Sequence, residues 1–156
     1  MSTATDRVAE ALRSHGVAVD IREFPEGTRT AEQAAAAVGT SVAQIVKSLV
    51  FLADGKPVLV LASGANRVDL IKLAGACNAH TARRADADTV RRVTGFVIGG
   101  VPPLGHAEPL AVLIDRDLLQ YEMVYAAAGT PHAVFAVDPR VLQVVTAAVV
   151  ADLRET

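Results

Sequence analysis

The chain has 156 residues, of which 51% are apolar and 4% aromatic, and it contains no tryptophan. This length suits one domain, and we expect residues 1–156 to form a single domain with a core of Val, Leu, Ile and Ala. The formal net charge of −2 excludes a protein that attracts nucleic acid through an overall basic field, so any RNA contact has to be local.

The first part of the chain predicts a helix, a strand and a second helix. Amphipathic spacing predicts a helix over residues 5–15, and alternation of apolar and polar residues predicts a strand over 17–22. A capping-box pattern then opens an alanine-rich helix over 30–39, and the same pattern recurs at 41–44.

The next segment predicts a central hairpin. The run Ile45–Ala53 is apolar on both faces, as expected of a strand that is covered on both sides. Asp54-Gly55 is a strong two-residue turn signal, and Val58–Ala62 predicts the returning strand.

The remaining elements mix helices and strands. In chain order, the pattern predicts helices over 68–74 and 87–93, strands over 96–98, 111–114, 123–127 and 133–137, and a C-terminal helix that starts at Pro139 and reaches Val149. Hairpins and helices alternate too irregularly for a doubly wound sheet. We therefore expect the α/β class, with a single mixed sheet.

Lys47 lies in the middle of the apolar strand 45–53. An ammonium group is costly to bury there unless an anionic or strongly polar group faces it. The lysine therefore either extends its stem out of the sheet or points into a cleft where a ligand meets it. Asn66–Asp69 follow the returning strand and could border such a cleft, although Asp69 is more simply the start of a helix.

A loop rich in glycine and proline follows residue 98. Its paired glycines, Gly99 and Gly100, allow a close approach of the backbone to a ligand, and Pro102 and Pro103 stiffen the exit. A stiff loop with free amide groups suits the binding of a carbonyl or a developing oxyanion, whereas an ordinary surface turn is the simpler alternative. The loop lacks the Gly-Lys-Ser/Thr of a phosphate-binding loop and the Gly-x-Gly-x-x-Gly of a dinucleotide site.

A third segment, 126–132, contains three alanines followed by Gly129 and Thr130. Small side chains at the end of a strand leave room for the floor of a pocket, and a closely packed strand is an equal alternative on local grounds.

Taken together, these three segments resemble the YbaK/ProX family of aminoacyl-tRNA deacylases, the domain also found inserted in bacterial prolyl-tRNA synthetases. The resemblance runs from about Thr30 through the C-terminal helix and rests on 45–51, 99–105 and 127–131. It implies a partly barrel-like mixed sheet with surrounding helices. It also implies a cytoplasmic trans-editing hydrolase that removes a wrong amino acid, such as Ala, Cys, Ser or Thr, from a tRNA such as tRNA-Pro.

The resemblance implies roles for named residues. Lys47 would position the substrate and offset its negative charge, and the Gly99 and Gly100 amides would bind the ester carbonyl as charge develops on it. Residues that would contact the substrate are Val101, Pro102, Pro103, His106, Gly129 and Thr130. The partners implied are the aminoacyl-tRNA 3′ end and a prolyl-tRNA synthetase. Some relatives have a small polar residue where this chain has Val101 and Pro102, so the amino acid removed stays open.

Two other functions are compatible with the sequence. One is a binding module for tRNA ends, nucleotides or a synthetase that kept the fold without the chemistry. The other is an unrelated small-molecule hydrolase, which requires a strong nucleophile beside a base in the cleft. The local basic cluster Arg83, Arg84, Arg91 and Arg92 is either a set of solvated helix charges or a contact for acceptor-stem phosphates.

The cysteine and histidine content predicts no metal site and no cofactor. Cys77 is the single cysteine, which excludes an internal disulfide and a cysteine-based zinc site. His80, His106 and His132 are too scattered for a helix-borne metal pair. The N-terminus lacks the features of a signal peptide and no apolar run approaches membrane-spanning length, so we expect a soluble cytoplasmic protein without membrane contact.

Overall fold

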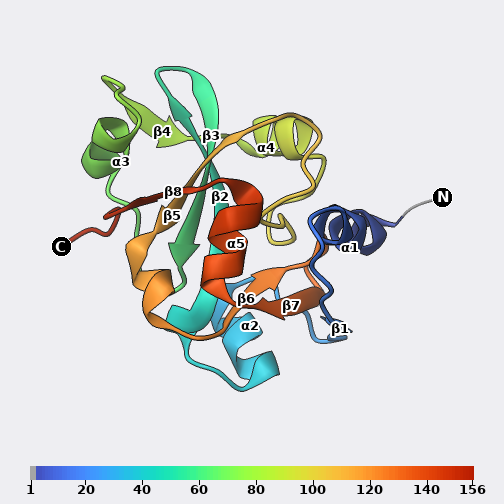
Figure 1. The fold of residues 1–156 in the computed structure, drawn as a ribbon. Coiled ribbons are helices and arrows are strands. Elements are labelled where there is room, and N and C mark those ends of the chain that lie inside the picture. Colours follow the sequence, from blue (N-terminus) through green and yellow to red (C-terminus); the bar gives the residue numbers. More distant parts are fainter. Residues whose placement is uncertain (1–2) are drawn as a thin grey trace.

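The computed structural model describes residues 3–156, and Figure 1 shows one sheet surrounded by helices. The sheet has eight strands in the order β1-β7-β6-β2-β3-β5-β8, with β4 paired to β2 off this path. Parallel and antiparallel pairs occur together, and within residues 3–156 the edge strands β1 and β8 do not pair with each other. The predicted mixed α/β fold is confirmed, and its sheet is open.

The elements have the following bounds. The helices are α1 (Ala4–Ser14), α2 (Ala31–Val38), α3 (Leu70–Ala76), α4 (Ala87–Thr94) and α5 (Pro139–Thr146), with short 3-10 helices η1 (Val42–Gln44) and η2 (Arg116–Gln120). The strands are β1 (Ile21–Glu23), β2 (Ile45–Ala53), β3 (Lys56–Ser63), β4 (Ala82–Arg84), β5 (Ala111–Asp115), β6 (Val124–Ala127), β7 (Ala133–Val137) and β8 (Val149–Ala151).

The predicted central hairpin is confirmed as β2 and β3. Asp54 and Gly55 both have positive φ, 48° and 80°, as a turn that matches the twist of the strands requires. The register pairs Lys47 with Ala62, and Ala62 is fully buried. The two strands therefore form the rigid centre from which Lys47 projects.

Both ends of α2 follow the capping signals in the sequence, whereas the start of η1 does not. Thr30 and Gln33 form a capping box at the start of α2, and Gly39 ends this helix in the left-handed conformation. Ser41 makes no capping hydrogen bond to the backbone of η1, because its hydroxyl donates to the Gln44 side chain instead.

Three predictions of secondary structure were wrong. Residues 96–98 form no strand, and a turn at Ile98 and Gly99 follows, closed by a hydrogen bond from the Gly100 amide to the Val97 carbonyl. The C-terminal helix ends at Thr146, because Ala147 turns left-handed at φ 54°, and Val149 belongs to β8, which pairs with β5. The strand predicted over 17–22 pairs only from Ile21, since Val17 and Val19 pack on the core without a strand partner.

The helices bury their apolar faces against different parts of the sheet (Figure 1). Helices α1, α4 and α5 contribute to the largest core cluster, through residues such as Leu12, Val93 and Leu142. Helix α3 covers β3 and the end of β2 through Leu73, and α2 packs on Ile45. Among residues 3–156, none of the helices combines the length and the apolar character needed to cross a membrane.

One edge of β2 has a gap in its pairing. Strand β6 runs parallel to β2 only at Ile45 and Val46, and β4 begins to pair at Phe51. Residues 47–49 therefore have a strand partner on the β3 side alone. The sheet splits at this point, and Lys47 lies where it opens.

Candidate functional site

A cavity of about 460 Å³ lies beside the gap in β2. Its walls come from residues in the ranges 28–34, 45–49, 98–101 and 125–127, together with Gly64, Arg84 and Val134. Segments that are far apart in the sequence thus meet here. The cavity brings Lys47 together with Gly99 and Val101 from the predicted loop, and with Ala126 and Ala127 from the predicted pocket floor.

Lys47 is half-buried in this cavity rather than directed into bulk solvent. Its Nζ donates a hydrogen bond of 2.5 Å to the carbonyl oxygen of Asn66. Burial lowers the pKa of Lys47, the nearby charge of Arg84 lowers it further, and the carboxylates of Glu32 and Asp115 act in the opposite direction. Within residues 3–156, the Lys47 ammonium forms no ion pair with a carboxylate, so its charge can serve a ligand.

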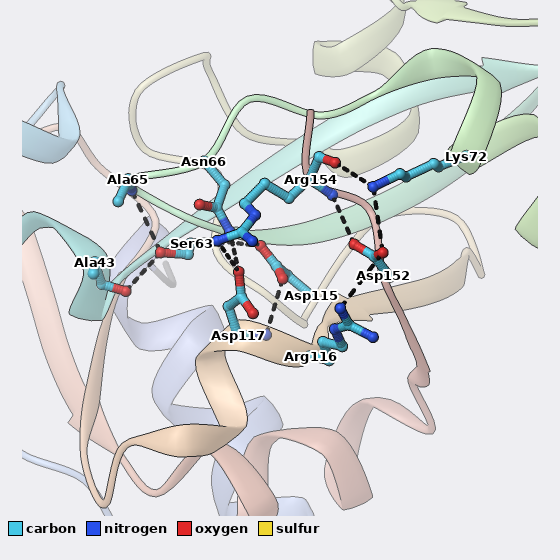
Figure 2. A network of polar contacts seen from close by, with 10 residues as sticks. All are labelled: Ala43, Ser63, Ala65, Asn66, Lys72, Asp115, Arg116, Asp117, Asp152 and Arg154. Atoms are coloured by element: carbon cyan, nitrogen blue, oxygen red, sulfur yellow. Dashed lines mark hydrogen bonds and ion pairs between the residues drawn. The ribbon is translucent and has the colours of Figure 1, made fainter. Parts of the chain in front are cut away.

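A buried polar network holds the acceptor of Lys47 in place (Figure 2). The Asn66 side-chain amide donates to Asp115 at 2.9 Å and to Asp117 at 2.8 Å, and the Ser63 amide donates to Asp115 at 3.1 Å. Asp115 is 1% exposed and Asn66 is 9% exposed. These contacts fix residue 66 and therefore the carbonyl that orients the Lys47 ammonium.

The sequence only partly indicated this network. Asn66 lies in the segment 66–69 for which bordering the pocket was one alternative, but Asp115, at the end of β5, was not predicted to take part. Asp69 has the simpler role, since its side chain caps α3 by accepting from the amides of Ile71 and Lys72.

The two glycines of the loop have different surroundings. The Gly100 amide donates to the Val97 carbonyl at 3.0 Å, so it is not free to bind an ester oxygen. A Cβ at Gly100 would lie 2.7 Å from the backbone of Thr130. The two segments therefore pack too closely for any residue with a side chain at position 100. Gly99 has φ +92° and lines the cavity, and its amide has no acceptor within residues 3–156. The role predicted for Gly100 is therefore corrected, and Gly99 is the amide left for it.

Pro102, Pro103 and His106 lie outside this cavity. His106 Nε2 is 2.7 Å from the Pro102 carbonyl oxygen, and its ring meets the Phe96 ring edge-on with centroids 6.4 Å apart. Burial lowers the pKa of His106, which favours the neutral imidazole. His106 and Pro103 line a separate hollow, so we assign them to supporting the loop rather than to contacting the substrate.

Gly129 and Thr130 also lie behind the cavity rather than in its wall. Gly129 is buried with φ +103°, and a Cβ there would lie 2.8 Å from the Ala4 carbonyl oxygen. The Thr130 hydroxyl accepts the amide of His132 at 3.2 Å. These residues shape the turn on which Gly100 packs, and His132 is exposed beyond it.

Two buried hydroxyls add polarity to the same wall. Thr28 Oγ1 and Ser48 Oγ are the two buried side-chain polar atoms of the described chain without a hydrogen-bond partner, and both residues line the cavity. An unpaired buried hydroxyl costs about 1–3 kcal/mol, and because protein atoms cover both oxygens, a bound molecule could pair with them only if the wall rearranges.

The cavity offers no nucleophile of the usual kind. Cys77 lies at the C-terminal end of α3, away from the cavity, and burial raises the pKa of its thiol. No histidine lines the cavity, so Ser48 has no imidazole base beside it there. Among residues 3–156, no three His, Cys, Asp or Glu side chains gather as a metal site would require. The wall instead offers the cations Arg29, Lys47 and Arg84, the carboxylate of Glu32 and the amide of Gly99.

Comparisons with known proteins identify the family. The profile of the family described as "Aminoacyl-tRNA editing domain" matches residues 25–144. YwhH, an uncharacterized protein of Bacillus subtilis (strain 168), is 34% identical over 124 residues, which cover 79% of this chain and 78% of YwhH. The proline–tRNA ligase of Geobacter sp. (strain M21) is 36% identical over 92 residues, which cover 59% of this chain but only 16% of the ligase.

Solved structures share the whole fold. A crystal structure described as that of a candidate trans-editing enzyme for prolyl tRNA synthetase superposes with a TM-score of 0.93 at 47% identity, covering 100% of this chain and 99% of the other. The hypothetical protein APE2540 superposes with a TM-score of 0.89 at 33% identity, covering 96% of this chain and 99% of the other. With the match of the family profile over residues 25–144, these likenesses show that the chain belongs to the aminoacyl-tRNA editing domain family.

Proposed function

We propose that this chain hydrolyses the ester bond between a wrong amino acid and the 3′ end of a tRNA. The observation that carries the proposal is that the Lys47 ammonium and the Gly99 amide, which has no acceptor within residues 3–156, line one cavity whose hydroxyls have no imidazole beside them. Membership of the editing-domain family supports it.

The geometry suggests how the reaction proceeds. The Lys47 ammonium orients the terminal nucleotide and offsets negative charge, while the Gly99 amide donates to the ester carbonyl oxygen as it becomes an oxyanion. Water attacks the carbonyl carbon, assisted by a neighbouring ribose hydroxyl, and the bond from that carbon to the ribose oxygen breaks. The proton lost by water passes to the leaving oxygen, and the products are the free amino acid and a tRNA with an intact 3′ end.

The walls favour a small amino acid. Ala31, Ala34, Ala126 and Ala127 line the cavity, and the unpaired hydroxyls of Thr28 and Ser48 lie in the same wall. Alanine, cysteine, serine and threonine all fit that description. A synthetase discriminates weakly against amino acids of similar or smaller size, which is why a second hydrolytic site is useful. The likeness to a candidate trans-editing enzyme for prolyl tRNA synthetase suggests tRNA-Pro as the carrier and that synthetase as a partner.

A panel of charged tRNAs tests the proposal. We expect purified protein to deacylate tRNA-Pro charged with at least one of Ala, Cys, Ser or Thr faster than the reaction without enzyme, and to spare tRNA-Pro charged with proline. Hydrolysis of no member of the panel would refute the enzyme, and tRNA binding without turnover would instead establish the binding module.

The lowered pKa of Lys47 predicts a pH dependence. We expect net deacylation, after subtraction of the spontaneous rate, to fall as the pH rises through that lowered pKa, because the ammonium is lost. Stability should change in the opposite direction. Between the folded pKa and the higher pKa of an unfolded lysine, the unfolded state binds more protons, so this group makes the free energy of unfolding increase with pH. A net rate that stays constant up to the usual pKa of lysine would contradict this role.

A further inference from the structure

A second cavity of about 700 Å³ adjoins the first at Lys47. Lys47, Leu49 and Arg84 line both cavities, so the two spaces meet at the gap in β2. The second cavity continues past the loop after β3 to the start of α3, where Arg67 and Ile71 form part of its wall. A molecule whose reacting group lies at Lys47 can therefore extend into this space.

The second cavity is lined by three cations, Lys47, Arg67 and Arg84, and by two carboxylates, Asp69 and Glu155. Arg84 is exposed and forms no ion pair within residues 3–156, and its guanidinium lies 5.8 Å from the centre of the Phe51 ring. Arg67 is 91% exposed and pairs with Glu155 at 3.4 Å. Both arginines lower the pKa of Lys47, as close like charges do. Within residues 3–156, Lys47 and Arg84 are the two cations of this wall without an ion-pair partner, and in a chain with a net charge of −2 they form a local positive feature that suits an anion.

An apolar surface lies next to these cations. Ile71 is 85% exposed and Leu70 is 41% exposed, and both line the second cavity. Single-stranded RNA binds to surfaces of this kind, because its phosphates bind cations and its unstacked bases pack on flat or apolar side chains. The structure thus offers both kinds of contact on one path that leads to Lys47.

We infer that the second cavity binds the nucleotides that precede the terminal adenosine of the tRNA, with Arg84 contacting a phosphate and Ile71 contacting a base. This inference rests on the proposed function, since it takes the ester to lie at Lys47. The inference assigns nucleotide binding to Arg84 alone among the four arginines of the basic cluster noted in the sequence. Arg84 faces the two cavities, the neighbouring Arg83 lines neither of them, and Arg92 pairs with Glu108 at 3.7 Å.

The test compares two substrates that share the same ester. One is the charged tRNA that reacts fastest in the panel, and the other is the aminoacyl-adenosine that pancreatic ribonuclease releases from it, which carries no phosphate. We expect Arg84→Ala to lower kcat/KM on the tRNA by about 10-fold or more, the scale of one charged hydrogen bond, and to lower kcat/KM on the aminoacyl-adenosine much less. Arg83→Ala, on the adjacent position of β4, is the matched control and should change neither value.

Direct binding provides a second readout that does not depend on turnover. A labelled single-stranded RNA ending in CCA should bind the wild type with a salt-dependent Kd, and Arg84→Ala should reduce the slope of log Kd against log salt by about 0.7, the value for one lost phosphate contact. Ile71→Ser should weaken binding several-fold, whereas Val144→Ser, equally exposed on α5 at 77%, should not.

The outcomes separate this inference from the proposed function. Equal effects of Arg84→Ala and Arg83→Ala, or an equal loss on both substrates, would overturn the nucleotide site while leaving the hydrolase intact. If the wild type hydrolyses no charged tRNA, the proposed function fails. RNA binding that depends on Arg84 would then still support the site, and absence of RNA binding would overturn it.

Discussion

We expect Lys47→Ala to slow deacylation by about two orders of magnitude or more while the chain stays folded. This is the scale for the loss of one preorganised electrostatic contact in a confined site. Lys47→Arg should also be poor, because a planar guanidinium does not replace a compact ammonium whose acceptor lies 2.5 Å away. Single-turnover rates on the best charged tRNA measure the effect.

Stability measurements separate this role from a structural one. The free energy of unfolding should change by less than about 1 kcal/mol in Lys47→Ala, since losing the hydrogen bond to Asn66 is offset by relief of the half-buried charge. Lys56→Ala, at an exposed position on β3, is the matched control and should leave activity unchanged. A Lys47→Ala protein with wild-type activity would refute the role given to this residue.

Asp115→Ala should be the most destabilising change in the network behind the site. The Asp115 carboxylate accepts hydrogen bonds from Ser63, Asn66 and Asp117, and its side chain is 1% exposed. Its removal leaves buried donors unpaired, so we expect a loss of about 3 kcal/mol in the free energy of unfolding. For a chain of this size, that corresponds to a decrease in Tm of roughly 6–12 °C.

The same substitution should affect the reaction through Asn66. Without Asp115, the Asn66 side chain keeps only its hydrogen bond to Asp117, so the Asn66 carbonyl holds the Lys47 ammonium less firmly. Deacylation should therefore fall even at temperatures where the variant is folded. Asp117→Ala is the control. Asp117 is only half-buried, and the one buried group that donates a hydrogen bond to it within residues 3–156 is the Asn66 side-chain amide. We expect it to cost less than about 1 kcal/mol. Equal stability of the two variants would contradict the central place of Asp115.

Local patterns predicted most of the regular structure. The hairpin of β2 and β3 follows from two apolar runs and a turn whose φ values suit Asp-Gly, and the capping box at Thr30 is a signal within four residues. Strands β4 and β8 were not predicted, because no local pattern marks them. Each has three residues and exists because a neighbouring strand, β2 or β5, offers a free edge in the folded chain.

The sequence by itself determined the mixed α/β class and the family, and it singled out two residues that line the candidate site, Lys47 and Gly99. Both can be found from the sequence because the signal is local and unusual: a lysine inside an apolar strand, and a pair of glycines shortly before a pair of prolines. Only the tertiary structure decided which of the two glycine amides lacks a hydrogen-bond acceptor, since the Gly100 amide donates to the Val97 carbonyl and the Gly99 amide has no acceptor within residues 3–156. It also decided that Asp115, 49 residues from Asn66, holds the acceptor of Lys47, and that Arg84 rather than Arg83 lines the two cavities. These outcomes depend on hydrogen bonds and strand pairings between distant segments, and a local pattern carries no information about which partner a distant group will find.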